Sequence, residues 1–223
     1  ALCRILDRKG ICAGEVRQQL TAGEKTSAVF EMELSNPSLW DLDSPYLYRC
    51  EILLMEDGII LDTAGDTFGI RKIEVDAARG FRLNGRQIKL KGGCVHHDNG
   101  FLGACAYPKA ERRKLEILKR VGYNTVRISH YPPSLTFLKL CDEMGMLLMD
   151  EAFAVWRMGK VPMDYHLYFQ AWWERDIEGM VRRDRNHPSV ITYSIGNEIT
   201  ERDGSNDGAA WSARLAGKVR SLD

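Results

Sequence analysis

The sequence predicts an all-β region followed by an α/β region. An immunoglobulin-like β-sandwich is expected over residues 1–78, and the first half of a (β/α)8 TIM barrel over residues 79–223. In the first region apolar and polar residues alternate in short runs, which is typical of antiparallel strands. In the second, a short apolar run is followed by a helical stretch four times over, which indicates parallel strands joined by helices. A closed barrel has eight such units in about 250 residues, so half a barrel is expected.

The first region is expected to hold four strands, because apolar residues recur there at nearly every second position. Glu56-Asp57-Gly58 supplies a turn between the last two strands, and Trp40 is a large apolar anchor between two proline breaks. About 75 residues are fewer than the roughly 100 of an immunoglobulin-like domain, so the sandwich is expected to be incomplete at its amino-terminal end. The expected strands are residues 14–20, 27–34, 47–55 and 59–73.

A hairpin with Asn84-Gly85 as its turn leads into the α/β region. Pro108 can begin a helix that Gly122 ends, and a second helix is expected from Ser134 to Gly145. A doubly wound open sheet would alternate in the same way, but the first strand-to-helix turn lacks the GxGxxG pattern, so half a barrel is preferred. The expected strands are 88–92, 124–129, 146–149 and 190–195, and the later helices are 167–185 and 209–219.

Composition excludes several kinds of partner. The chain has 31 Lys plus Arg and 31 Asp plus Glu, so no net charge attracts it to nucleic acid or to an anionic membrane. Its apolar runs are far shorter than the roughly 20 residues of a membrane helix. The 6 cysteines are scattered without a CxxC pair, which predicts free thiols and mildly favours a reducing, cytoplasmic location, although the amino terminus says nothing about export.

Polar residues gather where each of the four barrel strands is expected to end. Carboxyl ends of parallel strands meet at one face, and desolvating charged groups at every strand end would be costly outside one hydrogen-bonded pocket. The pattern therefore predicts an active site centred on the stretch 190–198, although Glu198 by itself could be an ordinary solvated loop residue. The residues are, strand by strand, His96, His97 and Asp98; Arg127 and His130; Asp150 and Glu151; Asn197 and Glu198.

Metal-dependent and serine-dependent chemistry are disfavoured. His96, His97, His130 and Glu151 are metal-ligand types, but two adjacent histidines point to opposite faces of an extended segment. Ser194 lacks the GxSxG pattern of a nucleophile elbow. Neither a metal nor a cofactor is expected.

Four motifs follow one another through the α/β region. They are Leu90 to Asp98, Asn124 to Pro132, the pair Asp150-Glu151, and Asp184 to Glu198. In this order they closely resemble glycoside hydrolase family 2, which contains the β-galactosidases, the β-glucuronidases and their relatives. The resemblance includes Trp40 to Tyr48 and Phe68 to Arg71, and so covers essentially the whole chain.

This resemblance implies a retaining exo-β-glycosidase in which Glu198 is the general acid/base and Asn197 binds the 2-hydroxyl of the sugar. A carboxyl group that first protonates the leaving oxygen and later deprotonates water suits that reaction. The resemblance implies that β-galactosides are the substrates. A β-glucuronidase and a non-catalytic carbohydrate-binding relative are the alternatives, and the full-length protein is expected to form a homo-oligomer.

The resemblance also implies roles for the other residues at the strand ends. His96, Asp98 and His130 match sugar-binding positions. Arg127 matches the arginine that keeps the nucleophile ionised, although it could instead pair with a structural acid. Glu151 is expected to support the site. Structural roles are expected for His97, His187 and Asp150.

The sequence departs from the family pattern in two ways. No segment after Glu198 resembles the one that carries the nucleophilic glutamate, so residues 1–223 alone are expected to be inactive. Ala154 and Trp156 stand where the magnesium-dependent members have a glutamate and a histidine, so that ion is not expected. Trp156 is instead expected to offer a stacking wall to the sugar.

Overall fold

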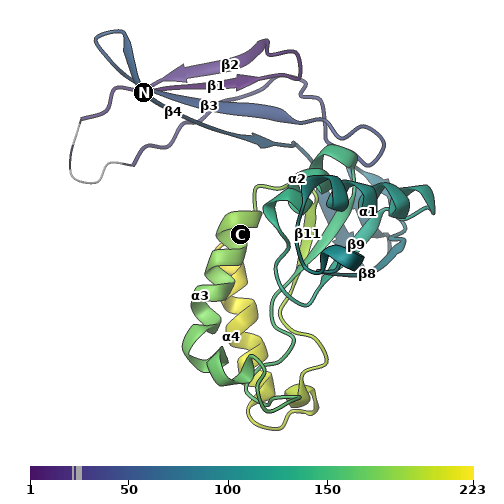
Figure 1. The fold of residues 1–223 in the computed structure, drawn as a ribbon. Coiled ribbons are helices and arrows are strands. Elements are labelled where there is room, and N and C mark those ends of the chain that lie inside the picture. The colour runs from purple at the N-terminus through teal and green to yellow at the C-terminus, as the bar shows by residue number, and fades with distance from the viewer. Residues whose placement is uncertain (22, 24–26) are drawn as a thin grey trace.

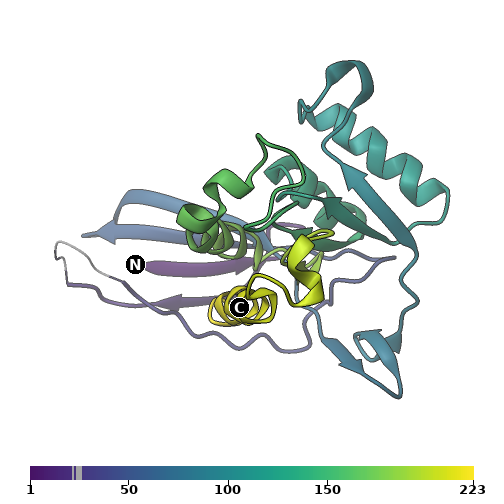
Figure 2. The same cartoon turned by 90° about the horizontal axis from the view of Figure 1, so that it is seen from below.

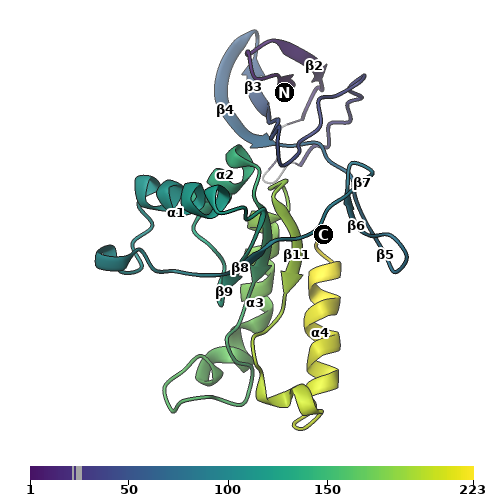
Figure 3. The ribbon, with the colours of Figure 1, turned by 90° about the vertical axis from the view of Figure 1, so that its right-hand side faces the viewer.

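A computed structural model of the chain describes residues 1–21, 23 and 27–223. A four-stranded antiparallel sheet lies at one end, and a parallel four-stranded sheet with its helices lies at the other (Figure 1). A small three-stranded sheet follows the antiparallel sheet in the chain and projects to one side (Figures 2 and 3). Within the described ranges, no helix combines the length and the apolar character needed to cross a membrane.

The antiparallel sheet has the strand order β2-β1-β3-β4. The predicted turn joins the last two of these strands, with Asp57 and Gly58 both at positive φ. β1 was not predicted, because its sequence Leu-Cys-Arg-Ile-Leu does not alternate, and the strand predicted at 14–20 begins and ends earlier. The strands are β1 Leu2–Leu6, β2 Cys12–Arg17, β3 Tyr48–Glu56 and β4 Ile59–Phe68.

The strand predicted at residues 27–34 is wrong. These residues are extended and alternate between half-buried and exposed side chains, but they pair with no strand of the described chain. The half-buried side chains of Phe30, Met32 and Leu34 face the sheet and line a cleft together with Cys3 and Cys50. The alternation of apolar and polar residues therefore indicates which side chains pack inward, but it does not show that the segment pairs with another strand.

The strand predicted at 59–73 ends at Phe68, and the next strand begins only at Ile73. A side chain at Gly69 would lie 2.7 Å from Pro188 and 2.9 Å from Trp40, so only glycine fits at this position. The three-stranded sheet follows, with the predicted Asn84-Gly85 turn, both residues at positive φ, between its last two strands. Its strands are β5 Ile73–Asp76, β6 Gly80–Leu83 and β7 Arg86–Gln87.

The parallel sheet has the order β8-β9-β10-β11, which is the chain order expected of half a barrel. The first strand was predicted at 88–92, but it begins at Gly92, and both glycines belong to it. The strands are β8 Gly92–His96, β9 Thr125–Ser129, β10 Leu147–Glu151 and β11 Val190–Ser194. The helices are α1 Pro108–Arg120, α2 Leu135–Met144, α3 His166–Asp184 and α4 Gly208–Arg220, with 3₁₀ turns at Gly100–Leu102 and Thr200–Asp203.

The first residue of α1 and both ends of α2 are those that the sequence predicts, whereas α3 and α4 each differ by one residue at either end. Pro108 is the first residue of α1, the Ser134 hydroxyl accepts the N–H of Phe137 at the start of α2, and Gly145 closes α2 in the left-handed conformation. The apolar faces of α1 and α2 pack on β8 to β11, around Leu115, Leu138 and Val126. α3 and α4 form a second core that includes Phe169 and Trp211.

The antiparallel region packs against the amino-terminal ends of the barrel strands. Trp40 is fully buried beside Leu83 and Leu147, and its indole N–H donates to the carbonyl of Asp142 at 2.8 Å. The Arg71 guanidinium donates to the carbonyl of Val190 at 2.6 Å. These contacts lie at the amino-terminal ends of the strands, opposite the carboxyl ends where the polar residues gather.

Candidate active site

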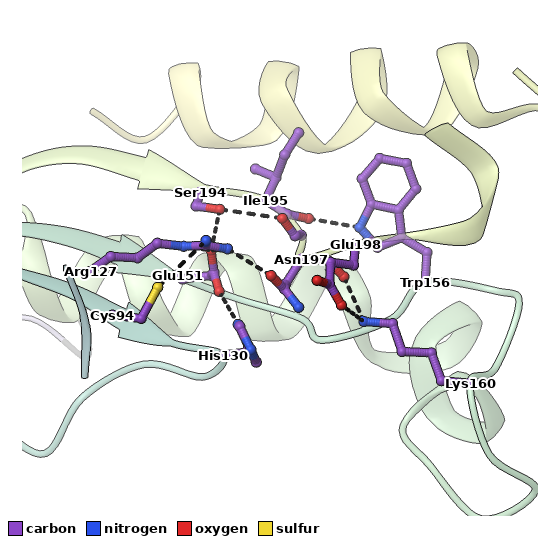
Figure 4. A network of polar contacts seen from close by, with 11 residues as sticks. Cys94, Arg127, His130, Glu151, Trp156, Lys160, Ser194, Ile195, Asn197 and Glu198 are labelled. Atoms are coloured by element: carbon purple, nitrogen blue, oxygen red, sulfur yellow. Dashed lines mark hydrogen bonds and ion pairs between the residues drawn. The ribbon is translucent and has the colours of Figure 1, made fainter. Parts of the chain in front are cut away.

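Glu151 is the centre of the polar network at the carboxyl ends of the strands (Figure 4). Its side chain is fully buried, and its oxygen Oε2 accepts from Nε of Arg127 at 2.7 Å and from Oγ of Ser194 at 2.5 Å. The other oxygen, Oε1, lies 2.7 Å from Nδ1 of His130. Three strands, β9, β10 and β11, or the residues just after them, therefore converge on one carboxylate.

Arg127 links this carboxylate to the end of β11. Its Nη2 donates to the side-chain oxygen of Asn197 at 3.0 Å, and Asn197 is 8% exposed. Burial lowers the pKa of the guanidinium, but the hydrogen bond and the charge of Glu151 outweigh it and raise that pKa. Since Oδ1 of Asn197 accepts from Arg127, Nδ2 is the donor end of that amide.

Glu198 lies next to this network but does not join it. Its side chain is 75% exposed and projects toward Lys160, whose Nζ lies 3.6 Å from Oε2 of Glu198 and donates to the main-chain oxygen of Asn197 at 3.0 Å. The φ of Glu198 is 45°, a left-handed conformation that is uncommon for residues other than glycine. A solvent-accessible carboxyl group thus stands beside the Asn197 amide, and this exposure is also what the alternative of a solvated loop residue implies for Glu198.

The predicted sugar-binding residues lie at the same end of the sheet. The rings of His96 and His130 meet edge to face, with centroids 5.3 Å apart. Asp98 lies on the exposed loop after β8, where its carboxylate accepts the N–H of Gly100 at 2.8 Å. Nε2 of His97 lies 3.2 Å from the carbonyl of Pro132, which fits the structural role expected of it.

The prediction that Trp156 offers a stacking surface to the sugar is wrong. Its ring is 2% exposed, lies in the core formed by α3 and α4, and stacks on Phe169. Its indole N–H donates to the carbonyl of Ile195 at 2.7 Å. A buried ring offers no face to a ligand, so Trp156 instead supports the end of β11 from below Gly196, where a side chain would lie 2.8 Å from the indole nitrogen.

Two buried acids belong to the framework. Asp150 lies beside Glu151 on β10 and is fully buried, and burial followed by the neighbouring Asp184 carboxyl raises the pKa of Asp150 well above its ordinary value. Asp142 accepts from the N–H and the hydroxyl of Ser189 and lies 2.5 Å from Nδ1 of His187. His187 and Asp150 thus have the structural surroundings expected of them.

Sequence reasoning missed Lys160 and the role of Ser194. Ser194 pairs in register with Glu151 across β10 and β11, so correct strand pairing would have placed it beside that carboxylate. Lys160 lies in the irregular segment before α3, where no periodicity marks it. Among the residues that the structure describes, no three His, Cys, Asp or Glu side chains gather as they would around a metal ion.

The carboxyl ends of the strands therefore carry an exposed carboxyl group, an amide and two imidazoles. The exposed carboxyl of Glu198 can donate a proton to an adjacent oxygen and take one back. Asn197 and the histidines can hydrogen-bond hydroxyl groups. Such an arrangement suits proton transfer to a polyhydroxylated substrate.

The chain belongs to glycosyl hydrolases family 2. Residues 73–223 match the TIM barrel domain of that family, and residues 4–71 match the preceding family 2 domain. The predicted class, a sandwich domain followed by part of a barrel, is confirmed, as is the predicted family. Named relatives of the chain include β-galactosidases and β-glucuronidases.

Two curated relatives illustrate the similarity. The beta-galactosidase BoGH2A of Bacteroides ovatus is 46% identical over 198 residues, which are 88% of this chain and 23% of that protein. A putative beta-glucuronidase of Formosa agariphila is 39% identical over 169 residues, 75% of this chain and 16% of that protein. The chain thus spans less than a quarter of the length of either relative.

Solved structures agree with the fold. A family 2 member from Bacteroides cellulosilyticus superposes with a TM-score of 0.95 at 45% identity, covering 100% of this chain and 29% of that one. A beta-glucuronidase from Parabacteroides merdae superposes with a TM-score of 0.84 at 26% identity, covering 100% of this chain and 28% of that one.

Proposed function

We propose that these residues belong to a retaining exo-β-glycosidase that removes terminal β-linked sugars and prefers β-galactosides. The observation that carries the proposal is the pair Asn197-Glu198 at the end of β11. Asn197 is fixed through Arg127 with its amide donor available, and Glu198 beside it is exposed. The 46% identity to a protein named a beta-galactosidase supports the choice of sugar.

In this mechanism Glu198 acts twice. It first gives its proton to the glycosidic oxygen as the bond to the anomeric carbon breaks and a second carboxylate bonds to that carbon. It then takes a proton from the water that releases the sugar. Asn197, bound to the 2-hydroxyl, stabilises the oxocarbenium-like transition state, while His96, His130 and Asp98 hold the ring.

The second carboxylate is proposed to come from a part of the protein outside these residues. A retaining mechanism needs two carboxyl groups about 5 to 5.5 Å apart. Glu151 is a poor nucleophile because it is fully buried and its two oxygens contact Arg127, Ser194 and His130. Glu151 is instead proposed to support the site.

The test uses the full-length gene product and a panel of aryl β-glycosides. We expect faster turnover of the galactoside than of the glucuronide; the reverse order would favour a β-glucuronidase. Glu198→Ala should lose turnover about 100-fold or more on poor leaving groups. On an activated leaving group, azide should restore its turnover by attacking the glycosyl-enzyme and forming a glycosyl azide. Unchanged hydrolysis by Glu198→Ala would reject the acid/base assignment. Sugar binding with no turnover by the wild type would favour a non-catalytic carbohydrate-binding relative.

The proposal also predicts that residues 1–223 by themselves hydrolyse no glycoside. The purified segment, of confirmed mass, would be assayed with an activated aryl galactoside beside the full-length protein. Turnover that Glu198→Ala abolishes in this segment would show that the second carboxylate lies within it.

A further inference from the structure

The ammonium of Lys160 bridges Asn197 and Glu198, which lie a few residues beyond the end of β11 (Figure 4). Nζ donates to the main-chain oxygen of Asn197 at 3.0 Å and lies 3.6 Å from Oε2 of Glu198. The Lys160 side chain is 35% exposed, whereas that of Glu198 is 75% exposed. The less exposed Lys160 therefore forms an ion pair with one oxygen of Glu198, whose side chain otherwise projects into solvent.

The loop that carries Lys160 is fixed from two sides. The N–H groups of Lys160 and Val161 donate to Oδ2 of Asp164 at 2.7 and 3.0 Å. The N–H groups of Arg157 and Met158 donate to Oε1 of Glu201 at 3.0 and 2.8 Å, and Glu201 is 1% exposed. These hydrogen bonds fix the backbone on both sides of Lys160, which distinguishes it from a lysine on an unconstrained surface loop.

The same segment fixes the turn at Glu198. The N–H of Asn197 donates to the carbonyl of Phe153 at 3.0 Å, while its own carbonyl accepts from Lys160. Phe153 and Glu198 both have positive φ, of 75° and 45°. Such conformations persist where the surroundings determine them. Both polar groups of the Asn197 backbone are thus held by residues 153–160, directly before the proposed acid/base.

We propose that Lys160 is a positioning residue for Glu198, and this inference rests on the proposed function. When the proton of Glu198 passes to the glycosidic oxygen, the electron pair of the breaking bond goes to that oxygen and the nucleophile bonds to the anomeric carbon. Glu198 is then a carboxylate, and the ammonium beside it stabilises that charge. An ion pair this exposed contributes little to folding, so the effect of Lys160 is expected in the reaction.

The experiment compares two substrates of one sugar in the full-length gene product. Protonation by Glu198 matters for a phenyl leaving group and far less for a dinitrophenyl one. We expect Lys160→Met to lower kcat/KM about 10- to 100-fold for the phenyl glycoside and less than about threefold for the dinitrophenyl glycoside. The ratio of the two values is independent of the fraction of correctly folded enzyme. Lys160→Arg should recover part of the loss, since it keeps the cation.

Two controls separate the possible failures. Lys109→Met changes an exposed lysine on α1 and should leave both values unaltered. Glu198→Gln should lose activity on the phenyl glycoside; if it does not, the proposed function is wrong. If Glu198→Gln loses activity and Lys160→Met changes neither value, or lowers both equally, then the role of Lys160 alone is overturned.

Discussion

Arg127 contacts a single oxygen of Glu151 with two of its nitrogens, Nε at 2.7 Å and Nη2 at 2.5 Å. The second oxygen is thereby left to His130 at 2.7 Å. The alternative considered for Arg127, that it pairs with a structural acid, is therefore compatible with a role in the site, because the guanidinium also reaches Asn197. The Arg127 guanidinium therefore contacts both the buried Glu151 and Asn197, the residue beside the proposed acid/base.

Glu151→Gln should destabilise the protein by about 3 kcal/mol, toward the lower end for breaking a buried ion pair because the Arg127 side chain is 31% exposed. The amide keeps the shape but removes the charge that Arg127 faces. Chemical denaturation would measure the loss, and Glu116→Gln, an exposed change on α1, should stay within about 0.5 kcal/mol. Equal stability of the two variants would contradict the role assigned to Glu151.

Gly92→Ala and Gly93→Ala should differ sharply although the two positions are adjacent. A side chain at Gly92 would lie 1.7 Å from the carbonyl oxygen of Thr125, whereas at Gly93 the nearest atom is 3.5 Å away. Gly92→Ala must push β8 from β9 and should cost about 3 kcal/mol or more, or prevent folding. Gly93→Ala should cost less than about 1 kcal/mol. Soluble yield and melting temperature would show the difference, and similar values would refute it.

Trp40→Phe should weaken the contact between the antiparallel region and the barrel. The substitution leaves the buried carbonyl of Asp142 without its donor, at a cost of about 1–3 kcal/mol. Trp172→Phe on the exposed face of α3 is the matched control and should be nearly neutral. A loss in the control as large as in Trp40→Phe would contradict the importance assigned to the Trp40 contact.

His187 should make stability depend on pH. Burial lowers the pKa of its imidazole, but the hydrogen bond and charge of Asp142 outweigh burial and raise it above the ordinary value of 6.5. Because the folded-state pKa exceeds the unfolded one, the stabilisation is complete below about pH 6.5 and is lost as pH rises through the folded-state pKa. Denaturation at a series of pH values would show this loss. His187→Gln should abolish it, whereas His97→Gln on an exposed loop should retain it.

Helix ends could be predicted from the sequence because their causes are local. Pro108, Ser134 and Gly145 act through their own φ, hydroxyl or missing side chain, whatever packs around them. The start of β8 and the pairing of residues 27–34 could not be predicted in this way. Whether an extended segment joins a sheet depends on a neighbouring strand far away in the chain, such as β9 for Gly92.

The residues of the candidate site also differ in whether local sequence could predict them. Asn197 and Glu198 are found from the strand that precedes them, since the end of β11 fixes their place. Trp156 was misplaced because the sequence does not show whether a tryptophan after a strand turns toward the cleft or into the core, and here the indole donates inward to Ile195. The place of Lys160 depends on how the irregular segment before α3 folds toward Asn197 and Glu198. Such a segment has no repeating sequence pattern from which its course could be predicted.

The anchoring of residues 157–160 has a consequence for engineering. One anchor, Asp164, follows the loop, but the other, Glu201, lies beyond β11, so the loop and its attachments come from two separate stretches of sequence. If the loop alone were replaced by that of a relative, the carboxylate that anchors the relative's loop from beyond β11 would not be transferred. The turn after Glu198 would therefore have to be exchanged together with the loop. Chimaeras that exchange residues 152–165 and 196–208 together should therefore keep activity that exchange of either stretch alone destroys.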